Sequence, residues 1–368
     1  MIEAGTINNV EKILITLDYL PRINFAMINS GIEACSSLIV ENNDERDWSQ
    51  IRISISGDYI KESFCRYEYL RSKNSLQVKE IDILPDVKVL SEITESIKTS
   101  FRLLIEEEKD VLFDKEYPIT LLAYDEWAGS SIMLEHLAAF VVPNNPLLPR
   151  IKVAAAKFLE EWTGSSAFDE YQTQDRNRVR AQVAAIYEAL RSEGIIYSAP
   201  PASFEETGQR IRLADKVLTE KIGTCIDTSL LIASCLEEAS IYPILVVLKG
   251  HVLVGAWLTP NIFHHMVCDD SSYLLKEIAD GNNNIVLLES TAITFSEHVT
   301  FEDAVKSAIR KVSDENNFQY FIDVHRCRLG NILPIPQRIM KDGTWEFVNE
   351  GLEHANALKK WMNLIIMI

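Results

Sequence analysis

The stretch Gly223-Thr224-Cys225-Ile226-Asp227 places a thiol directly before a long apolar run. That run, from residue 229 to residue 236, predicts a buried helix whose first turn would contain Cys225. Because free N–H groups and the helix dipole favour negative charge at this end of a helix, they would stabilise a thiolate. The alternative is that Cys225 is one more buried core thiol.

Two later residues complete a candidate catalytic set with Cys225. His251 begins a run whose period-two alternation predicts a strand, and Glu289 ends a second apolar strand. The chain between Cys225 and His251 is long enough for a helix, a turn and a returning strand, which would bring an imidazole toward the thiol. A buried carboxylate is costly unless it is paired, so we expect Glu289 to accept a hydrogen bond from His251. The alternatives are a core or edge histidine with no catalytic role and a solvent-exposed glutamate on an edge strand.

A second group of polar residues, His264-His265-x-x-Cys268-Asp269-Asp270, contains potential metal ligands. Adjacent histidines rarely share one metal ion, and no second ligand pair is evident, so a polar loop is favoured over a zinc site. We therefore expect no metal and no cofactor. The sequence also contains no phosphate-binding glycine loop.

Composition narrows the class of protein. The chain has 368 residues, 47% of them hydrophobic, and a net charge of −18, which argues against direct binding to nucleic acid phosphates. The six cysteines show no CxxC spacing, and residues 1–5 do not begin a signal peptide, so we expect reduced thiols and a cytoplasmic location. No segment has the roughly 20 consecutive apolar residues of a membrane span.

The elements that must position the candidate site follow a change in pattern near residue 127. Before it, short runs separated by polar turns predict an antiparallel β-sandwich. These expected strands are 35–41, 51–56, 77–84, 101–105 and 119–124. After it, helical periodicity alternates with further strand patterns. The expected helices are 148–162, 178–193, 225–239, 274–278 and 301–312, and the expected strands are 243–248, 251–258, 285–289 and 318–324.

These residues resemble the transglutaminase-like superfamily, which has a papain-type fold. The resemblance rests on Gly223-Thr224-Cys225 at a helix start, a histidine on a strand, and an acidic residue followed two positions later by Thr291. It implies that Cys225, His251 and Glu289 form a catalytic triad. The family usually has Asp-x-Thr where this chain has Glu289-Ser290-Thr291, and often has Trp where this chain has Leu253. Gln209 is a candidate oxyanion donor by analogy with papain-like enzymes, although its spacing from Cys225 differs and a loop amide is the alternative.

A resemblance over most of the chain is to the N-terminal module of large bacterial multidomain helicase/nuclease proteins. Its motifs are Leu137-Ala138-Ala139-Phe140-Val141-Val142-Pro143-Asn144, Gly208-Gln209-Arg210-Ile211-Arg212, Gly250-His251 and the triad segments. It implies an α+β organisation, with an immunoglobulin-like β-sandwich over 1–127 and a transglutaminase-like domain over 128–335. Residues 336–368 would be a tail or the start of a further domain, because 358–364 resembles the beginning of the next domain in those proteins.

Together these features predict a cysteine-dependent amide or isopeptide hydrolase that acts on a protein or peptide substrate. The resemblance further implies helicase or nuclease partners and a role in anti-phage defence. The alternative is a catalytically inactive recognition or scaffold module of a defence system. Neither hypothesis involves direct contact with nucleic acid or a membrane.

Overall fold

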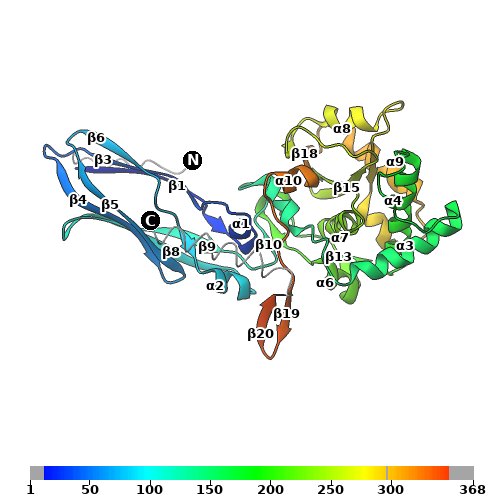
Figure 1. Ribbon diagram of the computed structural model, residues 1–368, viewed down its shortest axis with the longest axis horizontal. Coiled ribbons are helices and arrows are strands. Elements are labelled where there is room, and N and C mark those ends of the chain that lie inside the picture. Colours follow the sequence, from blue (N-terminus) through cyan, green and yellow to red (C-terminus); the bar gives the residue numbers. More distant parts are fainter. Residues whose placement is uncertain (1–11, 296, 348–368) are drawn as a thin grey trace. The chain divides into compact units, whose positions relative to one another are not determined.

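The computed structural model describes residues 12–295 and 297–347 of the chain. The molecule divides into two compact units, of which the first ends at Tyr124 and the second begins at Asp125 (Figure 1). The boundary predicted after residue 127 lies close to this division. Trp127 belongs to the second unit because its strand pairs there with a strand that contains Gln209.

The first unit consists of two sheets and two short helices. The three-stranded sheet has the order β1 (Ile13–Tyr19), β3 (Cys35–Asn42) and β6 (Asn74–Val78). The six-stranded sheet has the order β2 (Arg22–Ile23), β9 (Asp110–Leu121), β8 (Ile97–Glu107), β4 (Trp48–Gly57), β5 (Ile60–Leu70) and β7 (Leu84–Pro85). All pairs are antiparallel except β2 with β9. The helices are α1 (Phe25–Asn29) and α2 (Val87–Glu92).

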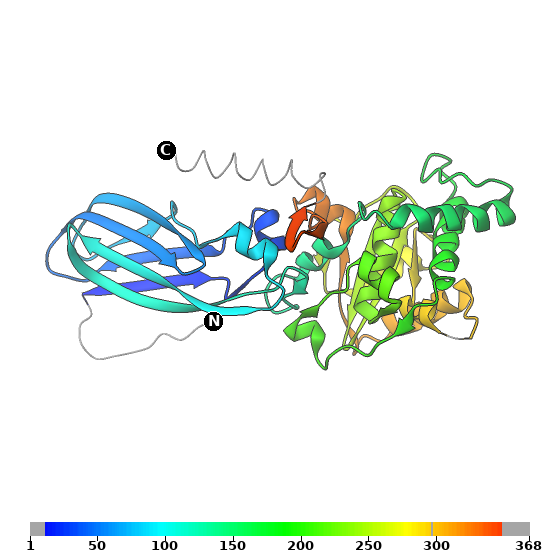
Figure 2. The ribbon, with the colours of Figure 1, turned by 90° about the horizontal axis from the view of Figure 1, so that it is seen from below.

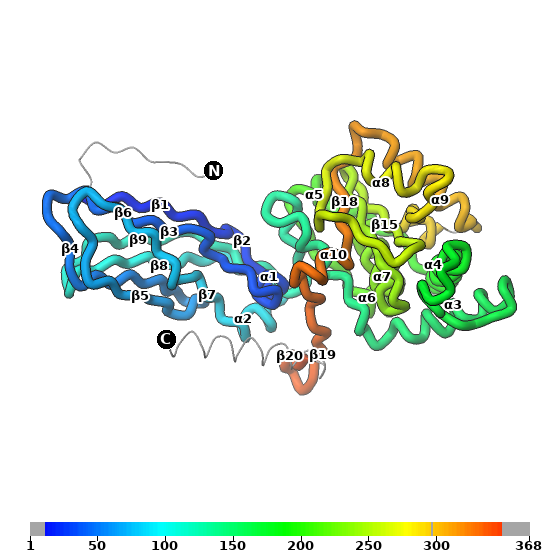
Figure 3. The backbone as a smooth tube through the Cα atoms, turned by 45° about the horizontal axis from the view of Figure 1, so that its top comes forward, coloured from blue at the N-terminus to red at the C-terminus, as the bar shows by residue number. Residues whose placement is uncertain are grey.

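The core of this unit follows from strand alternation. Ile51, Ile53 and Ile55 on β4 are all buried, since alternate residues of a strand point to the same face. The two sheets touch where the Tyr19 ring meets the edge of Phe101, with 5.1 Å between ring centroids. Figure 3 traces the strands of both sheets through this unit.

The single strand predicted over 77–84 is wrong. β6 ends at Val78, and pairing resumes only at Leu84 in β7, on the other sheet. Between them the Asp82 carboxylate accepts the backbone N–H groups of Cys35 and Ile83. A side chain that satisfies backbone donors in this way stabilises a loop in place of a strand ladder.

The second unit is built on a five-stranded antiparallel sheet. Its order is β16 (Val267–Cys268), β18 (Phe318–Asp323), β14 (Pro243–Leu248), β15 (His251–Trp257) and β17 (Ile285–Leu288). Three two-stranded pairs accompany it: β10 (Glu126–Trp127) with β12 (Gln209–Arg210), β11 (Ile196–Tyr197) with β13 (Ile222–Gly223), and β19 (Arg338–Lys341) with β20 (Thr344–Phe347). The two strands predicted over 243–248 and 251–258 are confirmed by β14 and β15.

Helices cover both faces of this sheet. The helices are α3 (Leu148–Thr163), α4 (Arg176–Arg191), α5 (Phe204–Thr207), α6 (Ala214–Glu220), α7 (Cys225–Glu238), α8 (Ser271–Ile278), α9 (Phe301–Val312) and α10 (Val324–Leu329), with 3₁₀ turns η1 (Leu134–Phe140) and η2 (Ser290–Thr294). Leu274 of α8 and Ala308 of α9 pack with Leu253 and Trp257 on one face. α7 packs along β15 from the other face, where Ser229 donates to the Val252 carbonyl (Figures 1 and 2).

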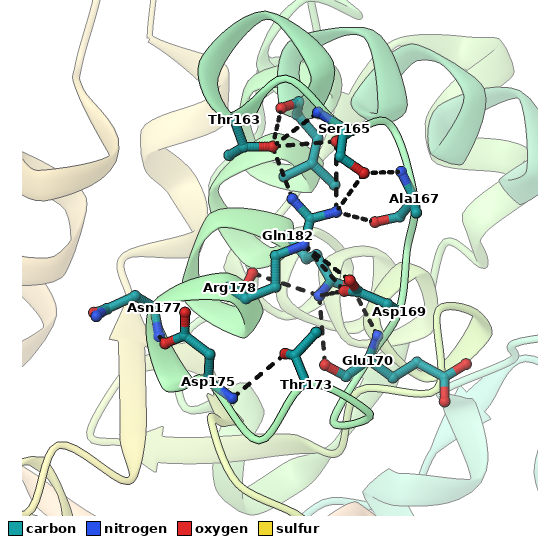
Figure 4. A network of polar contacts seen from close by, with 11 residues as sticks. Thr163, Ser165, Ala167, Asp169, Glu170, Thr173, Asp175, Asn177, Arg178 and Gln182 are labelled. Carbon is teal, nitrogen blue, oxygen red and sulfur yellow. Dashed lines mark hydrogen bonds and ion pairs between the residues drawn. The ribbon is translucent and has the colours of Figure 1, made fainter.

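A polar network fastens α3 to α4 (Figure 4). The Arg178 guanidinium donates to Thr163 Oγ1 at 2.7 Å and to the Asp169 carboxylate at 3.1 Å. Gln182, one turn further along α4, donates to the same carboxylate at 2.8 Å. Because α4 also packs against α7 and η2, this network helps to support the elements that carry the candidate site.

The molecule therefore combines helices with extensive sheet, and its β-rich part lies at the N-terminal side, as the sequence predicted. In residues 12–295 and 297–347, no helix has both the length and the apolar character required to cross a bilayer. The expectations for residues 1–5 and 358–364 lie outside the described residues.

Candidate active site

Cys225 is the first residue of α7, and a buried capping box sets its position. The Thr224 side chain accepts the N–H of Asp227, while the Asp227 carboxylate accepts the N–H of Thr224 at 2.9 Å. Asp227 is completely buried and also accepts the backbone N–H of Arg212 at 2.9 Å. Reciprocal capping satisfies helix donors that would otherwise have no partner, which fixes the start of the helix at the cysteine.

The Cys225 side chain is fully buried in this structure. Burial raises the pKa of its thiol to about 11, although the backbone N–H groups of Val252 and Ile226 partly oppose the shift. Val252 directly follows His251, so the sulfur lies against the backbone of the histidine strand. The helix N-terminus alone therefore does not produce the lowered thiol pKa that the sequence led us to expect.

His251 and Glu289 form a hydrogen-bonded pair in the candidate site. His251 Nε2 lies 2.9 Å from Glu289 Oε1 and 3.0 Å from Oε2. The antiparallel register of β15 and β17 pairs Val254 with Leu288, which brings the start of one strand to the end of the other. Glu289 itself lies after β17 and caps η2, where Thr291 donates both its N–H and its hydroxyl to Oε1. The Thr of the Glu-x-Thr motif thus holds the carboxylate in place.

Lys311, in the last turn of α9, is a member of this site that the sequence did not reveal. Its Nζ contacts the Glu289 carboxylate and lies 3.2 Å from His251 Nε2. Burial by itself would raise the pKa of Glu289, but hydrogen bonds from His251, Lys311 and Thr291 lower it to about 2. Glu289 is therefore ionised at neutral pH. The sequence carried no separate signal for Lys311, because a lysine near a helix C-terminus is common for electrostatic reasons.

The protonation of the His251 ring follows from its partners. An ionised carboxylate only accepts hydrogen bonds, so we assign a proton to Nε2, and Nδ1 is the acceptor in the neutral tautomer of the ring. In this tautomer Nε2 and Lys311 Nζ are both donors, and the Glu289 carboxylate holds them side by side. No hydrogen bond joins the Cys225 sulfur to the ring within the described residues. The structure thus pairs His251 with Glu289 and brings the sulfur beside the Val252 amide, without a thiol–imidazole hydrogen bond in the described residues.

Gln209 lies next to the start of α7. Its Nε2 donates to Thr224 Oγ1 at 3.3 Å, while its buried Oε1 has no partner in the described part of the chain. Exchanging the amide oxygen and nitrogen would leave a free donor there instead. The strand β12, which contains Gln209, follows a close approach of two backbones. A Cβ on Gly208 would lie only 2.1 Å from the Trp127 carbonyl oxygen, so there is no room for a side chain at this position.

A buried hydroxyl network links α7 to the residue after Glu289. Ser229 Oγ lies 2.8 Å from Ser290 Oγ, and Ser290 Oγ lies 3.3 Å from the Cys225 carbonyl oxygen. Both serines are fully buried. The network ties the cysteine helix to the carboxylate segment. Sequence reasoning did not identify it, because the two serines are 61 residues apart in the chain and meet only through packing.

The candidate metal ligands lie elsewhere. The rings of His264 and His265 meet edge to face, 5.4 Å apart. In the part of the chain that the structure describes, no group of three or more His, Cys, Asp or Glu side chains has the arrangement of a metal site. All six cysteines are free thiols.

No model of a known protein family matches the chain, and no curated protein sequence matches it. Among solved structures, the ASH/PapD-like domain of human CEP192 (PapD-like domain 7) is similar over 33% of this chain and 92% of that domain. The sequences are 14% identical and the TM-score is 0.19, so this likeness carries no argument about function.

Proposed function

We propose that this protein is a cysteine-dependent amide or isopeptide hydrolase of the transglutaminase-like type, with an immunoglobulin-like sandwich at its N-terminal side. Cys225 is the nucleophile, His251 the proton carrier and Glu289 the residue that orients the histidine. The observation that supports this most strongly is the 2.9 Å contact between His251 Nε2 and Glu289, beside a capped helix that begins at a cysteine.

The reaction uses each group in a defined order. His251 Nδ1 accepts the thiol proton as Cys225 Sγ bonds to the carbonyl carbon, and the carbonyl electron pair moves onto oxygen. The resulting oxyanion accepts the Cys225 N–H, with Gln209 as a candidate second donor. The carbon–nitrogen bond then breaks, His251 returns the proton to the leaving amine, and a thioester remains. Water, deprotonated by His251, attacks the thioester, and the Cys225 thiolate leaves and regains its proton.

This sequence of steps requires a change around the thiol. The sulfur must become accessible and approach Nδ1, because a fully buried thiol with a raised pKa is a poor nucleophile. Catalytic hydrogen bonds are often absent from unliganded sites and form when substrate binds. We therefore expect the start of α7 to open transiently in solution, which would expose the sulfur both to substrate and to small thiol reagents.

Thiol alkylation tests the proposal. Purified protein would be treated with substoichiometric iodoacetamide between pH 6 and pH 9, and each cysteine followed by peptide mass spectrometry. We expect Cys225 to react faster than a cysteine in an unfolded peptide, and His251→Gln to abolish that advantage. The half-buried Cys268 is the internal control, and its rate should be the same in both proteins. Equal, slow reaction of Cys225 in both would refute activation by the histidine.

The alternative is a recognition module without catalytic activity. In such a module Cys225, His251 and Glu289 would only stabilise the fold. The full burial of Cys225 and the absence, in the described residues, of a hydrogen bond from its thiol to the imidazole favour this second candidate. If the protein acts in anti-phage defence, a phage-challenge assay distinguishes the enzyme from the recognition module. This holds whether or not helicase or nuclease partners take part. Cells carrying Cys225→Ala lose protection if the protein is an enzyme and keep it if the protein only recognises a partner.

A further inference from the structure

A cavity of about 320 Å³ lies beside His251, on the side of the candidate site that does not include the thiol. It is lined by Leu248, Lys249, His251, Arg310, Lys311, Asp314 and Asn317. The wall is formed by the turn between β14 and β15 together with the end of α9 and the residues that follow it. The Lys249 N–H donates to the Asn317 carbonyl at 2.8 Å, which holds the two halves of the wall together.

The charges of this cavity are mostly positive and only partly neutralised. Lys311 is paired with Glu289, but Lys249 and Arg310 have no ion-pair partner among the described residues. Asp314 is the one acidic lining residue, and its carboxylate accepts the Asn316 N–H and the Asn317 side-chain amide. Two unpaired cations in one cavity are notable in a chain whose net charge is −18.

Helix electrostatics explains only part of this cluster. Basic residues in the last turn of a helix stabilise its negative end, which accounts for Arg310 and Lys311 in α9. Lys249 lies on a different element, in the strand turn, and receives no such stabilisation. The three cations therefore converge from two elements on a space large enough for a side chain or a terminal group.

We propose that this cavity binds a carboxylate carried by the leaving-group half of the substrate. The inference rests on the proposed hydrolase function: His251 delivers a proton to the leaving amine, and the cavity includes His251 but not Cys225. A carboxylate two or three bonds beyond that amine, as in a C-terminal residue or an acidic side chain, would reach Arg310 and Lys249. An arginine fork matches a carboxylate in a bidentate manner.

Binding can be measured without turnover. The full chain, labelled with ¹³C and ¹⁵N at histidine, would be titrated with succinate and, separately, with inorganic phosphate, and the His251 ring signal followed by NMR. We expect saturable shifts with succinate, weakened about tenfold or more in Lys249→Gln and in Arg310→Gln, as for the loss of a charge-assisted hydrogen bond. The matched control is Lys157→Gln on the exposed side of α3, which should bind as the wild type does. Equal binding by all four proteins, no shift at His251, or tighter binding of phosphate than of succinate would each overturn the assignment.

A kinetic comparison tests the position of the carboxylate. Peptide substrates with a free C-terminal carboxylate and with a C-terminal amide would be compared, and Arg310→Gln should raise KM for the first alone and leave kcat unchanged. If the protein hydrolyses neither peptide yet binds succinate at His251 as described, the proposed reaction fails and the anion site stands. If it hydrolyses both equally and succinate does not bind, the anion site fails and the reaction stands.

Discussion

The Glu289 carboxylate connects most of the groups that matter at the residue scale. It accepts hydrogen bonds from His251 and Thr291 and pairs with Lys311, while almost all of its own surface is buried. A buried carboxylate without these partners would be neutral or would destabilise the fold. The same contacts that would orient a catalytic imidazole therefore also contribute to stability.

The pH dependence of stability should reveal this carboxylate. Its pKa is lowered in the folded protein from about 4.5 to about 2, so its contribution is present above pH 4.5 and is lost as the pH falls toward 2. The shift corresponds to roughly 3 kcal/mol of unfolding free energy. We expect the difference in thermal midpoint between wild type and Glu289→Gln to shrink from pH 6 to pH 3. The control is Glu160→Gln on the exposed surface of α3, which should show little difference at any pH.

A second residue-scale prediction concerns Lys311. Lys311→Met keeps much of the side-chain volume but removes the cation beside Glu289, so the carboxylate keeps only His251 and Thr291. We expect the pKa of Glu289 to rise toward its usual range, because one of the groups that stabilise the anion is gone. Carboxyl ¹³C NMR of the full chain measures this directly. An unchanged Glu289 titration would show that the lysine contact has no influence in solution.

At the scale of single elements, the start of α7 decides where the thiol lies. The Thr224–Asp227 capping box is buried and tied to Arg212. At the start of α9, the exposed Thr300 side chain likewise accepts the N–H of the third helical residue, Asp303, but no reciprocal bond to the Thr300 N–H is found in the described residues. The two caps are therefore a matched pair, one inside the candidate site and one outside it.

We expect Thr224→Ala and Thr300→Ala to differ in function more than in stability. Each loses an N-cap acceptor, worth about 1 kcal/mol, with more expected at the buried site. Only Thr224→Ala should also change the rate at which Cys225 reacts with iodoacetamide and lower hydrolase activity, because it loosens the first turn that positions the cysteine. Unfolding curves and alkylation rates of both variants provide the comparison. Equal alkylation rates in the two variants would show that the Thr224 cap has no influence on the reactivity of Cys225.

The β10–β12 pair is the element that holds Gln209. Gly208 has a φ of +82°, and a Cβ there would lie 2.1 Å from the Trp127 carbonyl oxygen. Gly164, at the end of α3, has a φ of +75° but open space around it. We expect Gly164→Ala to cost about 1 kcal/mol of stability from backbone strain alone. Gly208→Ala must also separate two backbones, so its unfolding free energy should fall clearly further. If urea unfolding gave equal losses of unfolding free energy for Gly164→Ala and Gly208→Ala, the close approach of the two backbones at Gly208 would be contradicted.

At the scale of the whole molecule, each unit has its own buried core. The first is centred on the isoleucines of β4 with Phe101, and the second on the five-stranded sheet with its helices. Asp125, the first residue of the second unit, is buried and paired with Arg210 and Lys216 of the same unit. The chemistry proposed here involves residues of the second unit alone.

We therefore expect residues 1–124 and residues 125–368 to fold as separate proteins. Calorimetry of each piece should show a cooperative transition, since domains with their own cores generally fold as units. Alkylation of Cys225 in the second piece should proceed as in the full chain. A second piece that unfolds or aggregates at once would show that the first unit is required for its stability.

Local patterns in the sequence were enough to predict most of the elements around the site. The helix from Cys225, the strands of 243–258 and the helix of 301–312 are confirmed, because hydrophobic periodicity and turn residues act over a few neighbouring positions. The strand predicted over 77–84 is wrong, since the Asp82 carboxylate accepts the backbone N–H of Cys35, which is distant in sequence. Catalytic roles for Cys225, His251, Glu289 and Gln209 stay predictions.

What the sequence determined by itself is therefore local: which segments are helices or strands, and which reactive side chains lie at their ends. Only the tertiary structure decided that Lys311 joins the His251–Glu289 pair, that the thiol is buried against the Val252 amide, and that three cations surround a cavity. Those contacts depend on the register between strands and on how α7 and α9 pack on the sheet. Register and packing are set by the whole core at once, so no short stretch of residues encodes them.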